Sequence, residues 1–193
     1  MKAVLASLLL YLTTSSLAFA DSPTGLLFLS LEGAQNSRYG GIGWMEAPRG
    51  LDNSGPILLV ELGAAQGWRS HGAAMAGWRH ASGRTTTTLL GGVEFSAKLR
   101  PKASADIWWD DAGWMATTRA EATTDDASWR GAVGWRSVET LPWAGPEVSY
   151  KDDEFRFGAH ATGIKLPVGF EARTSTGWSA GNVYGELSVW RRF

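Results

Sequence analysis

Residues 183–193 have the sequence VYGELSVWRRF, in which apolar and polar side chains alternate. Successive side chains of an extended strand point to opposite faces. One face therefore carries Val183, Gly185, Leu187 and Val189, and the other carries Glu186 and Ser188. The segment predicts a β-strand with one apolar and one polar face, and it ends on Phe193.

The same alternation recurs along the chain after residue 20, with almost no helical periodicity. We predict strands over 25–33, 38–45, 56–68, 72–79, 85–99, 104–109, 114–122, 128–136, 143–150, 154–164, 168–178 and 183–193. Turn-forming residues separate them, and Pro146 predicts weak pairing in its strand. The spacing suits membrane-crossing strands of ~9–11 residues joined as hairpins. We expect an all-β fold, a single antiparallel up-and-down transmembrane β-barrel of about 12 strands formed by residues 21–193, with both termini on one side.

The first twenty residues have the pattern of a secretory signal peptide. Lys2 precedes an apolar run over residues 3–12, and Ala18 and Ala20 supply the small residues of a cleavage site. The run is shorter than the ~20 apolar residues that a membrane helix needs. We therefore predict export, with cleavage near Ala20.

The composition restricts the possible functions. The chain has no cysteine, which excludes thiolate metal sites and cysteine nucleophiles, and its net charge of −1 offers no polybasic surface for nucleic acid. Glycine and tryptophan are abundant, with 24 and 11 residues. Glycine suits barrel corners, and tryptophan favours the membrane interface. A ring of tryptophans near strand ends is expected, formed by Trp44, Trp68, Trp78, Trp109, Trp114, Trp135, Trp143, Trp178 and Trp190.

The alternating faces predict apolar side chains outside and polar side chains inside. Val93 and Leu89 share one face of their strand, whereas Glu94 lies on the other. A soluble sandwich or lipocalin-like barrel with apolar residues inside is the alternative. Small residues and charges of both signs on the polar face favour the membrane barrel.

Charged residues predicted to face the lumen form the candidate site. They are Glu94, Lys98, Arg119, Glu121, Arg130, Arg136, Arg156, Glu171, Arg173 and Glu186. They could close the lumen as a ladder of ion pairs or line a hydrated conduit. Barrels of about 8 strands are filled by side chains and barrels of about 16 strands enclose an open channel, so a 12-strand barrel lies between the two. The sequence predicts no long loop that could plug the lumen, which favours the ladder of ion pairs.

No catalytic or metal-binding constellation emerges. His71, His80 and His160 lack partners at metal-ligand spacing, and no G-x-S-x-G elbow occurs. The paired acids of the turns lack the alternation of a calcium loop. We therefore expect no catalytic residues, no metal and no cofactor.

Two stretches, RYGG at 38–41 and LDNSGPILLVELG at 51–63, resemble the cellulose biosynthesis protein BcsS family, as do AGPE at 144–147 and the ending from Tyr184 to Phe193. The resemblance implies an exported outer-membrane barrel associated with cellulose synthase components of Gram-negative bacteria. A terminal aromatic such as Phe193 is also typical of chains that barrel-assembly machinery inserts.

These observations predict a non-enzymatic outer-membrane barrel that is an accessory of cellulose biosynthesis or export. The expected partners are outer-membrane lipid, barrel-assembly machinery and cellulose synthase or export components or glucan, with no nucleic acid. A small passive outer-membrane pore is the alternative, followed by a barrel enzyme that modifies lipid or polysaccharide.

The predicted location can be tested by cell fractionation. The protein should sediment with outer membranes and migrate differently on gels before and after heating, because folded barrels resist unfolding in detergent. Recovery as a soluble periplasmic protein would contradict the membrane assignment.

Overall fold

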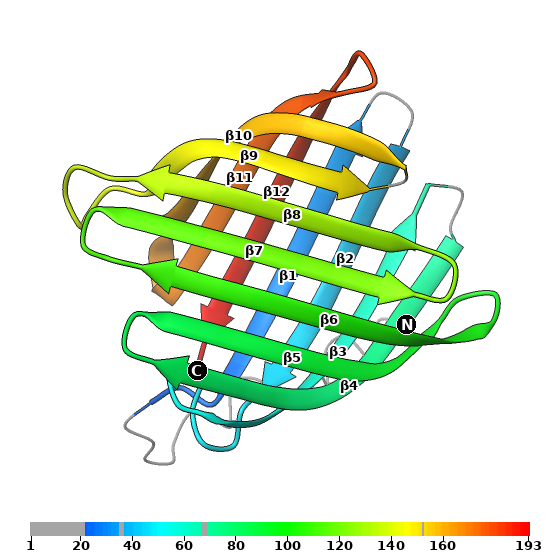
Figure 1. The fold of residues 1–193 in the computed structure, drawn as a ribbon, viewed down its shortest axis with the longest axis horizontal. Coiled ribbons are helices and arrows are strands. Elements are labelled where there is room, and N and C mark those ends of the chain that lie inside the picture. Colours follow the sequence, from blue (N-terminus) through cyan, green and yellow to red (C-terminus); the bar gives the residue numbers. More distant parts are fainter. Residues whose placement is uncertain (1–21, 35–36, 67–68, 152) are drawn as a thin grey trace.

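The computed structural model describes residues 22–34, 37–66, 69–151 and 153–193, so the predicted signal peptide lies outside the described residues. Twelve strands close into a single antiparallel barrel in which each strand pairs with its sequence neighbours (Figure 1). The strands are β1 (Gly25–Ala34), β2 (Ser37–Glu46), β3 (Gly55–Ala65), β4 (Arg69–Ser82), β5 (Thr85–Phe95), β6 (Leu99–Asp110), β7 (Trp114–Thr123), β8 (Ala127–Trp135), β9 (Trp143–Lys151), β10 (Glu154–Lys165), β11 (Phe170–Ser179) and β12 (Asn182–Arg192). The predicted all-β, up-and-down barrel is confirmed.

The barrel closes where the first strand meets the last. β1 and β12 pair from Leu26 with Arg192 to Ala34 with Tyr184. The backbone N–H groups of Thr24 and Gly25 both donate to the carbonyl of Phe193, at 2.9 Å each. The start of β1 and the end of β12 therefore lie at one end of the barrel, which we call the termini end.

Apolar side chains cover the outside of the strands. Leu62, Leu89 and Phe157 are 54%, 57% and 61% exposed, whereas inward-facing Glu147 and Ser175 are 4% and 3% exposed. A soluble barrel has the reverse arrangement, with apolar residues inside. In the part of the chain that the structure describes, no helix has the length and hydropathy to span a bilayer.

Exposed aromatic residues gather towards both ends of the outer wall. Trp78, Trp109, Trp114 and Trp135 lie towards the termini end, and Phe95, Trp129, Phe155, Phe157 and Trp178 lie towards the other end. This distribution fits two interfacial girdles separated by an aliphatic band. The assignment of Trp143 to the outer ring is wrong, because its indole Nε1 is buried and its ring packs against the inward Trp108. Trp68 lies outside the described residues.

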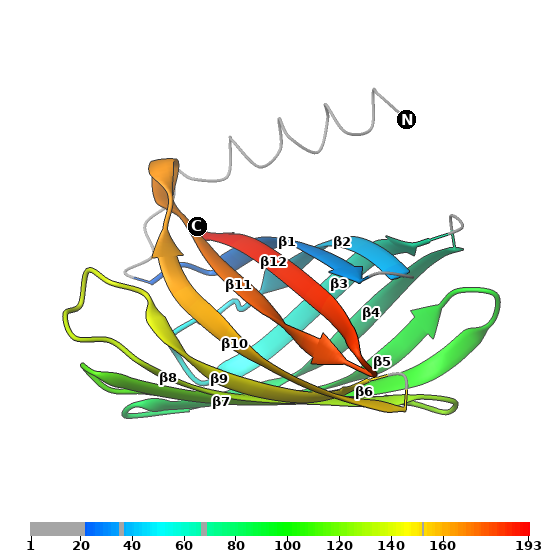
Figure 2. The same ribbon diagram turned by 90° about the horizontal axis from the view of Figure 1, so that it is seen from above.

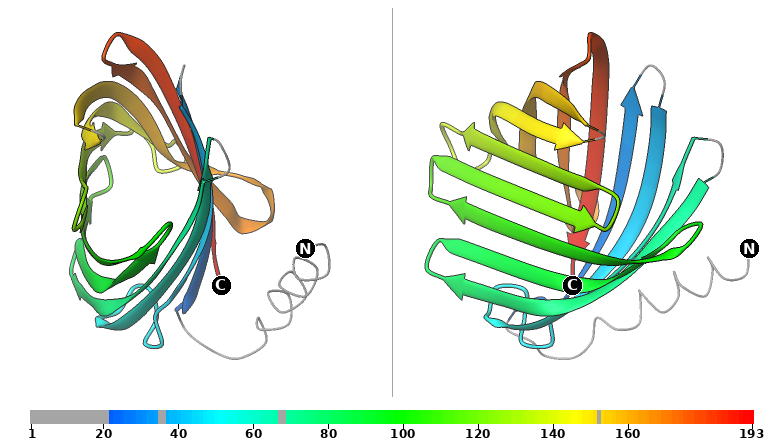
Figure 3. Two further views of the ribbon diagram at one scale, coloured as in Figure 1. Left: turned by 90° about the vertical axis from the view of Figure 1, so that its right-hand side faces the viewer. Right: turned by 45° about the vertical axis from the view of Figure 1, so that its right-hand side comes forward.

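The barrel is flattened, with β1, β2 and β12 on one side and β6, β7 and β8 on the other (Figures 2 and 3). Glycines allow the sharp bends between the two sides. A Cβ atom at Gly92 would collide with the Ala74 carbonyl on β4, and one at Gly177 would collide with the Phe157 carbonyl on β10. Glycine at such positions lets neighbouring strands approach at a steep angle.

The longest predicted strand, 85–99, is divided in the structure. β5 ends at Phe95, a turn follows over residues 96–98, and β6 begins at Leu99. Pro101, which lies between the predicted strands 85–99 and 104–109, is within β6 opposite Val93. Phe95 and Leu99 are paired across this turn, and both are exposed. The alternation of apolar and polar residues therefore continues through the turn, and the sequence pattern could not locate the turn.

Pro146 does interrupt pairing, as predicted. The β8–β9 register passes from Ala132 opposite Glu147 to Trp135 opposite Ala144 and omits the residues between them. Proline has no N–H to donate to a neighbouring strand.

A small apolar core fills part of the lumen near the termini end. Leu51, from the connection 47–54, packs with Ile57, Leu59, Met75 and Leu90. Its backbone is fixed there because its N–H donates to the Pro23 carbonyl and Arg79 donates to its carbonyl at 2.6 Å. Connections at this end, such as 47–54 and 136–142, are longer than those at the other end, such as 96–98 and 124–126.

Lipid exposure of the outer wall can be tested with arginine. Val93→Arg or Leu187→Arg should destabilise the barrel by ~2–4 kcal/mol near the bilayer midplane, because a charge would enter hydrocarbon. Unfolding by urea in lipid vesicles measures the loss, with Asp52→Arg at an exposed connection as the control. Equal tolerance of arginine at positions 93 and 52 would show that Val93 does not face lipid.

Candidate functional site

Charged side chains cross the lumen between its two flattened sides. We call β12, β1 and β3 the glutamate wall, after Glu186, Glu32 and Glu61. We call β6 to β9 the basic wall, after Lys102, Arg119, Arg130 and Lys151. Ion pairs that join these two walls run from a glutamate of the first to a base of the second.

The first crossing is centred on Glu61 of β3. Its carboxylate lies 3.6 Å from Lys102 Nζ and 3.7 Å from Arg119. Glu121 on β7 holds both bases, at 3.0 Å from Lys102 and 2.5 Å from Arg119. Glu94 contributes an ion pair with Arg100 at the edge of this group. The group is therefore a network in which each base is shared between acids.

The second and third crossings lie on the other side of the lumen. Arg130 donates to Glu186 at 2.5 Å, which joins β8 to β12. Lys151 donates to Glu32 at 2.5 Å, and Arg156 donates to the same carboxylate at 2.6 Å. Three strands separate β8 from β12 around the barrel, so these contacts span the interior rather than following one sheet face.

Glu147 is the most deeply buried acid of the network, with a fully buried side chain. Arg173 of β11 donates to it, and Arg130 Nε lies 3.6 Å away. An isolated carboxylate in such a place would be very costly, and two guanidinium groups offset that cost. Glu147 thus links the Arg130 crossing to β11.

Each wall also places like charges side by side. Glu32 and Glu186 are directly opposite each other in the β1–β12 register. Arg119 and Arg130 are directly opposite each other in the β7–β8 register. Like charges in these positions repel each other. Each is stabilised by an opposite charge reached across the lumen.

The structure brings most of the predicted lumen residues into this network. Members that form ion pairs inside the barrel are Glu94, Arg119, Glu121, Arg130, Arg156, Arg173 and Glu186. Glu171 shares the face of Arg173 but forms no ion pair within the described part of the chain.

Two predicted lumen residues lie elsewhere. Lys98 falls in the turn 96–98 and binds Asp125 of the β7–β8 turn at 2.8 Å. This contact holds the pKa of the Asp125 carboxyl below its usual value. Arg136 follows β8, donates to the carbonyls of Ala112 and Glu139, and stacks 3.7 Å over the Trp143 ring. Both predictions failed because β5 ends at Phe95 and β8 ends at Trp135, whereas the alternation of apolar and polar residues continues beyond both positions.

Sequence reasoning missed several members of the network: Glu32, Glu61, Lys102, Glu147 and Lys151. Glu61 lies in the apolar run PILLVEL, whose two faces are hard to tell apart by pattern. Lys102 was assigned to a turn, and Glu147 follows the proline of a weak strand. Glu32 lies within the predicted strand 25–33, on the face opposite Leu31, and Lys151 lies one residue beyond the predicted strand 143–150, so the alternation could have found both.

Aromatic rings inside the lumen are covered by other side chains. Tyr39 stacks on His71 with ring centroids 5.3 Å apart, and Lys151 Nζ lies 5.8 Å from the Tyr39 ring. Tyr184 is 1% exposed. Gly158 leaves room for its hydroxyl, because a Cβ there would lie 2.8 Å from it. None of these rings offers a free face for stacking on a sugar.

His160 is engaged on both ring nitrogens. Nδ1 lies 2.8 Å from the Thr162 hydroxyl, and Nε2 lies 3.2 Å from the Val133 carbonyl. With Nε2 protonated, the imidazole donates to the carbonyl and accepts from the hydroxyl. The described residues also contain no group of three or more His, Asp or Glu arranged to hold a metal ion.

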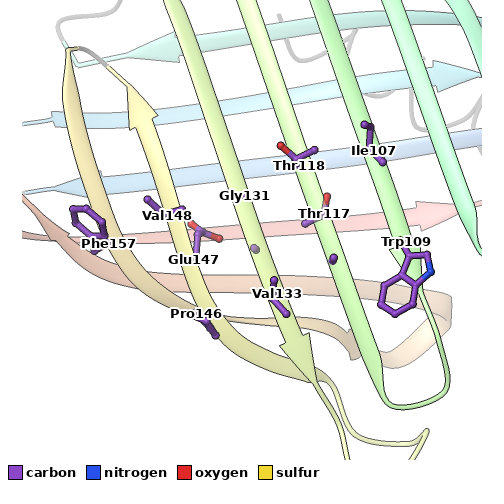
Figure 4. A pocket seen from close by; sticks show the side chains of 12 residues that line it. Ile107, Trp109, Thr117, Thr118, Gly131, Val133, Pro146, Glu147, Val148 and Phe157 are labelled. Carbon is purple, nitrogen blue, oxygen red and sulfur yellow. The ribbon is translucent and has the colours of Figure 1, made fainter.

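A depression of about 500 Å³ lies on the outer wall, and Glu147 of the charged network is among the residues that line it. Ile107, Trp109, Val133, Val148 and Phe157 surround it, with Pro146 at its edge (Figure 4). These outward side chains are apolar, and small residues such as Ala116 and Gly131 form the floor. The depression therefore belongs to the apolar outer surface, and the charged interior is the candidate functional site.

Comparison with known proteins agrees with this architecture. Residues 99–193 match the family described as cellulose biosynthesis protein BcsS. The resemblance to BcsS is confirmed over this range, which contains Ala144–Glu147 and the C-terminal strand. The motifs at 38–41 and 51–63 lie outside the matched residues.

Two solved structures that resemble this chain are of the KdgM porin. The KdgM porin in complex with disordered oligogalacturonate has a TM-score of 0.67 and 10% sequence identity, with 87% of this chain and 99% of that chain covered. A second KdgM porin structure gives a TM-score of 0.66, with the same identity and coverage. At this identity the likeness concerns the fold alone. Comparison with curated proteins gave no match.

The buried position of Glu147 leads to a stability prediction. Glu147→Gln should destabilise the barrel by about 3–5 kcal/mol, because it leaves Arg173 and Arg130 without their shared carboxylate. Tryptophan fluorescence during urea unfolding in vesicles measures this loss. Glu171→Gln is the matched control, since it removes an acid of the same barrel that forms no ion pair. Similar stabilities of the two variants would mean that Glu147 contributes little.

Proposed function

We propose that this protein is an outer-membrane β-barrel that serves cellulose biosynthesis as a non-enzymatic accessory component. The observation that carries the location is the inverted distribution of its side chains, with leucine, valine and aromatic residues outside and ion pairs inside. Only a surrounding apolar phase makes that distribution favourable. The BcsS match supports the link to cellulose.

The partners follow from this location. Residues 1–20 direct export and are removed near Ala20, and Phe193 serves as the residue that barrel-assembly machinery recognises. Phe193 lies against Gly25, where a Cβ atom would collide with its ring, and packs edge-on to Trp44 at 5.4 Å. Outer-membrane lipid surrounds the barrel, and cellulose synthase or export components, or the glucan itself, are its functional partners.

The role is one of binding or organisation rather than catalysis. A hydrolytic centre needs a nucleophile beside an available base. His160 faces the lumen beside Ser175 in the β10–β11 register, but Thr162 and the Val133 carbonyl occupy its nitrogens. Both ring nitrogens of His160, the one buried histidine among the described residues, are therefore occupied, and this supports a non-enzymatic role.

A passive pore is the second candidate, because the KdgM porins share the fold. The ion pairs that join β3 to β7, β8 to β12 and β9 to β1 favour a closed lumen instead. Covered aromatic rings also leave no stacking path for a glucan chain. Steady conductance of the wild-type protein in planar bilayers would favour the passive pore over the accessory role.

The link to cellulose can be tested by gene deletion. A deletion strain should secrete less cellulose, measured as the acid-insoluble glucan of the culture, and the full-length gene should restore it. A gene without codons 2–20 is the control, because its product stays in the cytoplasm and should restore nothing. Unchanged cellulose in the deletion strain would refute the proposed role.

A further inference from the structure

The basic wall has the features of an anion-binding surface. Arg119 and Arg130 are direct neighbours in register, with side chains 44% and 32% exposed. Lys102 on β6 and Lys151 on β9 flank them, so four consecutive strands each contribute a base. Lys102 and Arg119 already share one carboxylate, that of Glu121, so neighbouring bases of this row lie close enough to act on one anion.

The groups that occupy this surface are the protein's own carboxylates. Glu61 lies near Lys102 and Arg119, Glu186 binds Arg130, and Glu32 binds Lys151. These three glutamates come from the opposite wall and occupy the basic wall as bound anions would, beside Glu121 and Glu147, which stand on the basic wall itself. Arginine and lysine bind carboxylates from any source by the same charge-assisted hydrogen bonds.

We propose that the lumen is a self-blocked anion conduit, in which Glu32, Glu61 and Glu186 occupy a row of bases that otherwise binds and passes carboxylate-bearing anions. The adjacent carboxylates of Glu32 and Glu186 repel each other, as do the guanidinium groups of Arg119 and Arg130. Contact between the walls relieves both repulsions and keeps the conduit closed. An anion that replaces the glutamates relieves the repulsion on the basic wall and allows the walls to separate.

Charge selectivity in planar bilayers tests this inference. The variant E32Q/E61Q/E186Q should conduct steadily where the wild type is closed. In a KCl gradient the reversal potential of this variant should shift towards the equilibrium potential of chloride, because the bases that remain in the lumen attract anions. Added citrate, a probe with three carboxylates, should block this current by binding to them.

A mirror variant separates selectivity from general damage to the barrel. The variant K102Q/R119Q/R130Q/K151Q removes the basic row. It should conduct with a reversal potential shifted towards the equilibrium potential of potassium, and citrate should not block its current. D52N/D111N/E139Q removes three acids from the barrel ends and should remain closed like the wild type. Heat-modifiable gel mobility shows that each variant has folded.

The inference is overturned if the glutamate variant stays closed, lacks chloride preference or ignores citrate, or if both lumen variants show the same selectivity. Should the triple variant fail to assemble, E186Q alone decides, because it removes the partner that Arg130 reaches across the lumen and leaves Arg130 beside the like-charged Arg119. Chloride-selective openings of E186Q support the conduit, and closure identical to the wild type rejects it. The outcome is independent of cellulose secretion, so this inference and the proposed function can fail separately.

Discussion

Contact between unlike charges across the lumen is the interaction on which the interior depends. Glu32 stands beside Glu186 on one wall, and Arg119 stands beside Arg130 on the other. Neither like-charged pair would be stable alone in a confined interior. Together they neutralise each other, and Glu147 extends the pairing to Arg173 behind them. The interior is thus stabilised by pairing rather than by apolar packing, except for the small core around Leu51 and Ile57.

The shape of the barrel makes these contacts possible. The interior of a barrel widens with strand number, and flattening shortens the distance between side chains on opposite walls. Gly92 on β5 and Gly177 on β11 belong to strands between the two flattened sides, and a side chain at either position would press on the neighbouring backbone. These glycines therefore act on the charges indirectly, because flattening brings glutamates within reach of arginines. Lumen chemistry and backbone curvature are coupled in this way.

Alternation sufficed to predict the strands and their number, because period 2 is imposed by strand geometry itself. The outward direction of Val93 and Leu187 followed only when the small and charged residues of the polar faces were added. Alternation failed where strands end. Lys98 and Arg136 follow the period but lie beyond β5 and β8, and Trp143 turns inward. The pairing partners Glu61 and Lys151 could not be predicted either, because contacts across the lumen depend on how a barrel is flattened, which no local pattern encodes.

The unequal connections at the two ends determine which parts of the molecule other proteins can reach. Outer-membrane barrels usually carry short periplasmic turns and long external loops. Here the longer connections, 47–54 and 136–142, lie at the termini end, and within the described residues the opposite end has short turns such as 96–98 and 124–126. If the termini face the periplasm, the cell surface displays little of this chain for antibodies, phages or proteases to bind.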